Sequence, residues 1–212
     1  MIIHDCNKMS RQLDDNSYSS ANAIAVAGLN LALSFENASV ERLEKRLSES
    51  IVPEVKQKIL HHLDQTKKQQ ERLRERISVL GTGMPPTSEK GRLPIPEPPH
   101  KLKMMIESSS SDMEREVWES LNDLIIERAE AIMYRGGIQA LQLLKVDKKT
   151  IKELEKCLKE EEVFGDWLEK NNPKIAKRLM ITQIEEKKQG RRKKMRKTVQ
   201  EEKEEEAVSA AV

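Results

Sequence analysis

The chain is poor in aromatic residues, and this shortage narrows its fold class. Phe, Trp and Tyr together make up 3% of its 212 residues, whereas charged residues make up 35%. Most all-β folds need aromatic and β-branched side chains on their sheets, so this composition argues against them. It is instead typical of long helices built from Ala, Leu, Glu, Lys and Arg, and the length suffices for one domain with tails.

The chain also has few cysteines and a small net charge. Cys6 and Cys157 are the only cysteines in the sequence, too few for a disulfide framework. We therefore expect a reducing, cytoplasmic compartment. The 38 Lys and Arg residues nearly cancel the 36 Asp and Glu residues, so no overall electric field favours a nucleic-acid or membrane partner.

The sequence has no long hydrophobic run. Its longest apolar stretch, residues 21–35, contains Asn22, Asn30 and Ser34 and is too short to span a bilayer. It also lacks a basic flank immediately before it and an obvious cleavage site, so we do not interpret it as a signal peptide. We expect no membrane partner.

The motifs of several enzyme classes are missing as well. The sequence contains no nucleophile–base pair, Gly-rich phosphate loop, CxxC pair or dinucleotide fingerprint. Hydrolase, kinase and dehydrogenase activities therefore have no residues to carry them. Whether the protein is an enzyme at all is left open.

What the sequence does contain is helical periodicity. We predict four long helices, over about residues 20–50, 53–80, 113–144 and 147–170. Short connections make the first two helices one antiparallel hairpin and the last two another. The third helix has apolar residues on most sides and is expected to be the most buried.

Local signals set the ends of these helices. Pro53 suits the first turn of the second helix, and Gly81 suits its end. Asp147 can cap the fourth helix, and the run Asn171 to Pro173 is expected to stop it. Another helical turn or two follows through Leu179.

A long connection separates the two hairpins. Six of the eight prolines lie within residues 81–112, which also include a short apolar helical piece at 101–106. Ordinary helix connections are far shorter, so we interpret this segment as a crossover along the whole bundle. The alternative is an interdomain linker, but neither half has enough apolar surface to fold alone. The predicted fold is an all-α four-helix bundle over residues 20–180.

Both ends of the chain differ from this domain. Residues 1–19 are polar and aperiodic, which predicts a flexible leader. Residues 181–212 form a charged tail, in which the basic block Lys187–Lys197 precedes an acidic block. Such blocks are usually solvated, disordered or a frayed helix. The basic block is a candidate nucleic-acid contact, but the neighbouring acids compete for the same lysines.

Each predicted helix carries an ionisable residue on the line of apolar residues that should face the core. Such a residue costs free energy unless something pairs with it. In chain order, the four lines are Leu29, Leu33, Glu36, Val40, Leu43 and Leu47; Val52, Val55, Ile59, His62, Thr66, Gln69 and Leu73; Val117, Leu121, Leu124, Glu127, Ala131, Tyr134, Ile138 and Leu141; and Ile151, Leu154, Leu158, Glu161, Gly165 and Leu168. Four helices with a core acid or imidazole each suggest a metal site inside the bundle.

The pattern matches part of the ferritin-like di-iron and di-manganese plan. In that plan two helices give one inward Glu each, and the other two give Glu-x-x-His. Here the predicted metal ligands are Glu36, His62, Glu127, Glu130 and Glu161. Carboxylate oxygen and imidazole nitrogen suit iron or manganese.

Simpler interpretations of the same residues stay open. Glu36 could be a half-exposed acid, and His62 a hydrogen-bonded core histidine. Glu127 and Glu130 could form internal ion pairs with Arg128 or with a Lys from another helix. Tyr134 could support a ligand, although such a Tyr is more often a core residue with its hydroxyl satisfied.

Four segments together resemble the YciE/YciF ferritin-like stress-protein family. They are Leu33 to Ala38 (LSFENA), His61 to Leu73 (HHLDQTKKQQERL), Glu127 to Tyr134 (ERAEAIMY) and Leu158 to Glu162 (LKEEE). The resemblance covers about residues 21–179. It implies a ferritin-like bundle with a metal site at mid-height, often dimeric, and a role in stress response.

Three positions depart from that family's pattern. Gln65 stands where an acid is usual, Arg128 where a His is usual, and Gly165 where an Asp is common. These changes remove an acid and a His, and we expect Arg128 to add a buried cation. The resemblance therefore implies one metal, or a degenerate site held by ion pairs, rather than two full metal sites.

The preferred function is therefore a ferritin-like metal-binding protein with iron or manganese in the bundle core, acting in oxidative or general stress response. We expect a homodimer. The alternatives are a non-catalytic helical interaction protein and nucleic-acid association through Lys187–Lys197. Redox chemistry on peroxide or dioxygen rests on analogy with the fold.

Overall fold

The computed structural model describes the backbone of residues 2–81 and 99–209 and the side chains of residues 20–81 and 99–198. Within these residues the chain is helical and contains no strand. The helices are α1 (Ile2–Glu49), α2 (Pro53–Leu80), α3 (His100–Glu107), α4 (Asp112–Leu143) and α5 (Lys148–Ser209). The predicted all-α bundle is confirmed.

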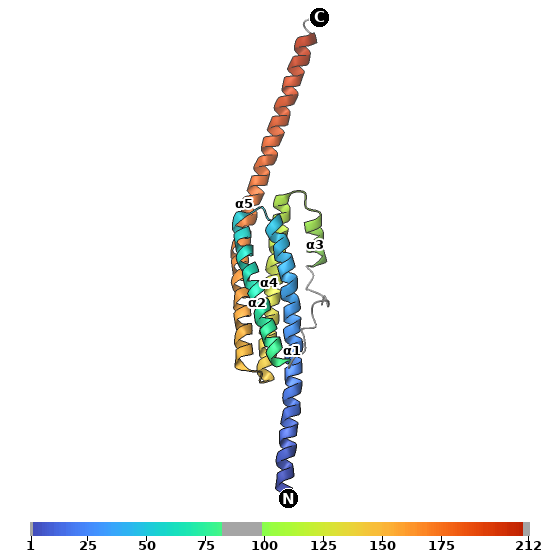
Figure 1. Ribbon diagram of the computed structural model, residues 1–212. Coiled ribbons are helices and arrows are strands. Elements are labelled where there is room, and N and C mark those ends of the chain that lie inside the picture. Colours follow the sequence, from blue (N-terminus) through green and yellow to red (C-terminus); the bar gives the residue numbers. More distant parts are fainter. Residues whose placement is uncertain (1, 82–98, 210–212) are drawn as a thin grey trace.

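Four long helices lie side by side as two hairpins (Figure 1). α1 packs along α2, and α4 packs along α5, while α1 meets α4 and α2 meets α5. α2 ends at one end of the bundle and α4 begins at the other, so the two helices point the same way. The predicted crossover would join these two ends, but its residues 82–98 lie outside the described part of the chain. The short α3 packs against α4, and its range is close to that of the helical piece predicted over residues 101–106.

Two of the predicted helix boundaries have the expected local chemistry. The backbone N–H of Gly81 donates to the Ile77 carbonyl at 2.8 Å, which ends α2. The Asp147 carboxylate accepts from the backbone N–H of Thr150 at 3.0 Å and from its hydroxyl at 2.6 Å. Asp147 thus caps the first turn of α5, as the sequence predicts.

The predicted stop at Asn171 to Pro173 is wrong, because α5 continues through Pro173. Ile175 and Leu179, beyond the proline, are buried in the apolar core. Burial of these side chains favours continuation of the helix. The Asn172 side chain also donates to the Ser120 carbonyl on α4 at 2.7 Å, which holds this turn against the bundle.

The two terminal segments are helical at the backbone level. α1 begins at Ile2 rather than near residue 20, and the tail continues α5 as far as Ser209. The first twenty residues contain no Pro or Gly to interrupt a helix. Figure 1 shows both extensions projecting from opposite ends of the bundle. The flexibility predicted for residues 1–19 stays a prediction.

A polar layer divides the bundle core into two apolar parts. One part holds Leu29 and Leu33 of α1 with Leu73 and Ile77 of α2 and their neighbours. The other holds Leu43 of α1 with core residues of α2 and α5. Glu36 lies on α1 between these two parts, and it is 1% exposed. The predicted core lines of α1, α2 and α5 are therefore buried or half-buried along their length.

The helix α4 is less buried than its composition suggests. Ile132 is 66% exposed, and Ile125 and Leu121 are also exposed. Polar residues take their places in the interior, namely Glu116, Glu119, Ser120, Asn122 and Asp123. α4 nevertheless has twelve buried residues, against nine in α2, and the described parts of α1 and α5 have no more than nine each. The prediction that α4 is the most buried helix is therefore confirmed, although its inner face is largely polar and pairs with arginines of α1.

Part of α1 passes a simple test for a membrane span. Among the described residues, Ser20–Glu49 is one helical segment that is long and apolar enough to cross a membrane. The core helix of a soluble protein passes the same test. One side of this segment carries Leu29, Leu33 and Leu43 into the bundle core.

Candidate metal centre

The five predicted metal ligands all lie in the polar layer of the bundle core. Each of them is at most 1% exposed. They come from all four long helices: Glu36 from α1, His62 from α2, Glu127 and Glu130 from α4, and Glu161 from α5. The helical spacing of each core line turns its ionisable residue inward at the same height as the others.

Three of these residues converge closely. Nε2 of His62 lies 2.9 Å from Oε2 of Glu127 and 3.4 Å from Oε2 of Glu161. One ligand atom from each residue lies within 4.8 Å of the other two. The imidazole stacks on the ring of Phe164, with centroids 4.3 Å apart, which fixes its plane.

The other two acids stand beside hydroxyl donors. The Tyr134 hydroxyl donates to Oε1 of Glu36. The Ser39 hydroxyl donates to Oε1 of Glu130 at 2.5 Å. Tyr134 is 4% exposed, so it supports Glu36 from inside the core, as the sequence allows.

An arginine of α1 enters the site, and the sequence reasoning missed it. Arg42 donates to Glu127 Oε1 at 2.6 Å and to Asp123 Oδ1 at 2.8 Å. One turn further, Arg46 donates to Asp123 Oδ2 at 2.8 Å and to Glu116 at 3.0 Å. A ladder of buried ion pairs thus extends from the polar layer along the α1–α4 seam.

The acids of the site keep oxygens without hydrogen-bond partners. Oε2 of each of the four glutamates is buried, and Nδ1 of His62 has no hydrogen-bond partner among the described residues. Oε2 of Glu127 and Oε2 of Glu161 lie 2.9 and 3.4 Å from Nε2 of His62, so both pair with the imidazole. Among the described residues, Oε2 of Glu36 and Oε2 of Glu130 have no such partner. A buried polar atom left without a partner costs about 1–3 kcal/mol. The carboxylate oxygens and the imidazole nitrogen gathered here are atoms suited to binding a cation.

The charge balance of the site also favours binding of a cation. Four carboxylates face one guanidinium and one imidazole. Burial, together with the charges of Glu161 and Glu130, raises the pKa of Glu36 well above its usual range. Burial, together with the charges of Glu127 and Glu161, does the same to the pKa of Glu130.

The pKa values of the other three ionisable residues, Glu127, His62 and Glu161, shift in different directions. Burial raises the pKa of Glu127, but His62 and Arg42 outweigh it and bring that pKa to about 2. Burial lowers the pKa of His62, but Glu127 and Glu161 raise it well above its usual value. Burial, partly offset by His62, raises the pKa of Glu161 to about 7. The upward shifts of the pKa of Glu36 and of Glu130 favour protons on these two acids when no metal is bound.

The departure at Gln65 does not place an amide in the site. Gln65 is half-buried, whereas Gln69, one turn further along α2, is fully buried. The side-chain amide of Gln69 donates to Oε1 of Glu161 at 2.5 Å. His61 lies on the exposed side of α2, as expected.

The departures at Arg128 and Gly165 belong together and lie outside the site. Arg128 donates to Asp166 at 2.8 Å and also to Glu169 on α5. A Cβ atom on Gly165 would lie 3.3 Å from the Arg128 guanidinium, so the glycine makes room for the arginine. The expectation that Arg128 supplies a buried cation is therefore wrong, since Arg42 is the arginine beside the acids.

Two solved structures resemble this fold. YcfI from Rhodopseudomonas palustris has 19% sequence identity and a TM-score of 0.60, over 70% of this chain and 92% of its own. A protein from Xanthomonas campestris pv. campestris has 16% identity and a TM-score of 0.61, over 77% of this chain and 98% of its own. At these identities the likeness establishes the helical fold alone.

The sequence comparisons identify a family without assigning an activity. A family model described as "Domain of unknown function (DUF892)" matches residues 22–180, close to the predicted bundle. No curated protein matches the chain.

Proposed function

The chain belongs to the DUF892 family, and from the chemistry of its core we propose that it is a ferritin-like metal-binding protein. The supporting observation is the set of four buried glutamates around a single buried imidazole, with Oε2 of Glu36 and Oε2 of Glu130 left without a hydrogen-bond partner among the described residues. A divalent cation would neutralise these acids and give their oxygens a partner. The donor set of carboxylate oxygen and imidazole nitrogen suits iron or manganese.

His62, Glu127 and Glu161 would hold the ion, since their donor atoms converge. Glu36 and Glu130 lie in the same polar layer and would complete the set of carboxylates around the ion. Tyr134, Ser39 and Gln69 would orient the carboxylates by donating to their other oxygens, as supporting groups do in metal sites. Iron or manganese in such a site supplies one-electron chemistry on peroxide or dioxygen, and this assignment depends on analogy with the ferritin-like fold.

The test is metal analysis of the full chain after loading with manganese or ferrous iron and removal of free ions. We expect about one ion per chain, the number that one imidazole and its nearest carboxylates support. Glu161→Gln keeps the acceptor for Gln69 but removes the charge, and it should lower metal affinity at least about tenfold. Glu160→Gln is the matched control, because Glu160 pairs with Arg72 at the side of the bundle.

The outcomes are distinct. Metal in the wild type and in Glu160→Gln, but not in Glu161→Gln, supports the proposal, provided that circular dichroism shows all three proteins helical. A wild type that retains no metal after loading, or a Glu161→Gln variant that retains as much as the wild type, contradicts it.

A second function is favoured by one observation. Arg42 already satisfies Glu127 and Asp123, as expected if ion pairs hold the core of a non-catalytic interaction protein. A metal-free wild type would support this function. The stress-response role, the homodimer and the cytoplasmic location stay predictions.

A further inference from the structure

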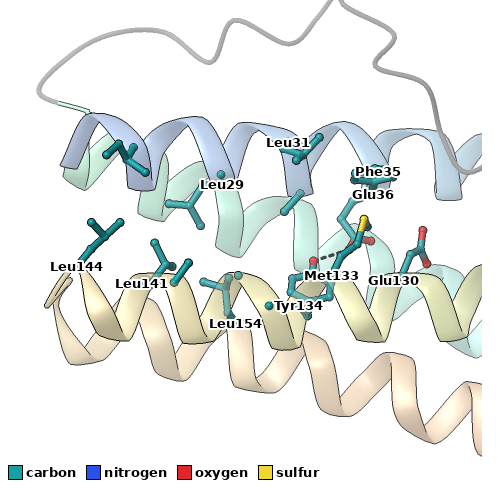
Figure 2. A pocket seen from close by; sticks show the side chains of 16 residues that line it. Leu29, Leu31, Phe35, Glu36, Glu130, Met133, Tyr134, Leu141, Leu144 and Leu154 are labelled. Atoms are coloured by element: carbon teal, nitrogen blue, oxygen red, sulfur yellow. Dashed lines mark hydrogen bonds between the residues drawn. The ribbon is translucent and has the colours of Figure 1, made fainter. Parts of the chain in front are cut away.

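An apolar groove opens between α1 and α4 and leads to two of the proposed ligands. It has a volume of about 340 Å³. We call it the α1–α4 groove and define it by Gly28, Leu31 and Phe35 of α1 with Met133, Gly137 and Leu144 of α4. Figure 2 shows the leucines towards one end and Glu36 and Glu130 towards the other. The groove is thus apolar along its length and acidic at its inner end.

Small residues keep this groove open. A Cβ atom added at Gly28, Gly136 or Gly137 would meet no atom within 4 Å. α3 packs against α4 near the other half of the seam, where Leu102 is buried. The α1–α4 groove is the half of the seam that α3 leaves uncovered.

The inner end of the groove has two carboxylate oxygens that lack a hydrogen-bond partner among the described residues. Glu36 and Glu130 line the groove, are at most 1% exposed, and each keep an unpartnered Oε2. Because these oxygens are buried, the surface of another folded protein cannot reach them. A slender molecule that enters the groove along its axis can.

The shape of the groove selects the ligand. From Glu130 to Leu144, α4 measures about 21 Å at the rise of an α-helix, so the groove is long relative to its volume. Its walls are apolar and mostly aliphatic, and its acidic groups lie at one end. The complementary molecule is a single unbranched aliphatic chain with one polar head.

We propose that the α1–α4 groove binds a free single-chain fatty acid, whose chain lies between α1 and α4 and whose carboxylate reaches the metal ion proposed for the polar layer, at the end of the groove lined by Glu36 and Glu130. The head-group assignment rests on the proposed metal-binding function. Without a cation, Glu36 and Glu130 are neutral or negative and offer no positive charge to a carboxylate. The proposal therefore requires fatty-acid binding to depend on the metal.

The test uses isothermal titration of the full chain with decanoic acid at concentrations where the acid is monomeric. Decan-1-ol, which has the same chain and no charge, measures chain binding alone. We expect decanoic acid to bind the manganese-loaded protein at least about tenfold more tightly than the metal-free protein, whereas decan-1-ol binds both forms alike.

Filled-groove variants locate the binding site. Gly137→Met and Gly28→Met place a side chain in the groove from opposite walls, and both should weaken both ligands at least about tenfold. Replacing a helical glycine also favours folding, so these variants should remain helical. Gly190→Met is the matched control, because Gly190 is a helical glycine of α5 with the same open surroundings, far from the groove.

Each result decides one part of the proposal. Equal binding of both ligands to the wild type and the filled variants, or no binding of either, overturns the groove as a site. A dimer that dissociates in Gly137→Met shows a second copy as the occupant and also overturns it. Groove-dependent decan-1-ol binding with metal-independent decanoic acid binding overturns the head-group assignment. Metal analysis of the same sample shows whether the failure lies in the metal-binding function instead.

Discussion

Arg42 is the residue on which the charge balance of the core depends most. Its side chain is 15% exposed, and both of its acidic partners are fully buried. Removing one member of a buried ion pair leaves its partner charged and without compensation, at a cost of about 3–5 kcal/mol. Exposed ion pairs contribute about 0–1 kcal/mol. The burial of an arginine within the bundle therefore decides how much its ion pairs contribute to stability.

We predict that Arg42→Met lowers the free energy of unfolding by about 3 kcal/mol or more. Methionine retains much of the aliphatic stem, so the loss reports the charge. Arg178→Met is the control, because Arg178 pairs with Glu54 at the surface and should change stability by less than about 1 kcal/mol. Urea denaturation measures both variants. Equal losses would show that the ion pairs of the polar layer are solvated.

Cys157 is predicted to be chemically inert in the folded protein. It is 1% exposed, and burial raises its pKa to about 12. The reactive species is the thiolate, which is therefore almost absent at neutral pH. In a Cys6→Ser background, a disulfide reagent such as DTNB should react with Cys157 only when urea unfolds the bundle. Rapid reaction of the native protein would show that this part of the core opens readily.

At the scale of the helices, the polar residues of α1 and α4 form two matched lines. Ser39, Arg42 and Arg46 follow one another at helical spacing on α1. The facing line on α4 is Glu116, Ser120, Asp123, Glu127 and Glu130. Each arginine meets acids of the opposite line, so the pairing fixes the register of the two helices.

The continuity of α5 leads to a prediction about its proline. Pro173 has no N–H for the carbonyl four residues earlier, and a proline in a helix interior costs about 3 kcal/mol. Pro173→Ala should therefore raise the free energy of unfolding, by up to about 3 kcal/mol. Pro53→Ala is the matched control, because Pro53 lies in the first turn of α2, where no helical bond is lost.

Urea denaturation of the two proline variants separates the possibilities. A gain in Pro173→Ala alone agrees with a continuous α5. No gain in either variant would mean that the helix ends before Pro173, as the run of Asn and Pro in the sequence indicates.

These elements show which features a sequence reveals. Apolar periodicity identified the five inward ionisable residues, because a single helix determines which of its faces is buried. It did not identify Arg42, since Arg42 lies beside the apolar line and its burial depends on the acids of α4. The stop at Pro173 failed for a similar reason. The apolar core beyond it is formed by other helices, and their packing outweighs a local signal.

At the scale of the whole molecule, the bundle and its C-terminal extension are energetically separate. Among the described side chains of α5, Leu179 is the last buried one, and those from Ile184 to Thr198 are exposed. Gln183 still donates to Ser111 at 2.8 Å, so the contacts with the bundle end about there. The remaining helix, with its basic block Lys187–Lys197, projects away from the other helices (Figure 1).

Truncation after Ile184 should therefore leave the free energy of unfolding within about 0.5 kcal/mol of the full chain, because no buried contact is lost. The same variant tests the nucleic-acid hypothesis. If Lys187–Lys197 contacts phosphates, the full chain should bind a duplex DNA probe, as measured by fluorescence anisotropy. The affinity should fall steeply as the salt concentration rises, and truncation should abolish the binding. Metal content should be equal in both proteins, since the polar layer lies in the bundle. A truncated protein that unfolds more easily or loses metal would contradict the separation, because the extension would then stabilise the site from outside.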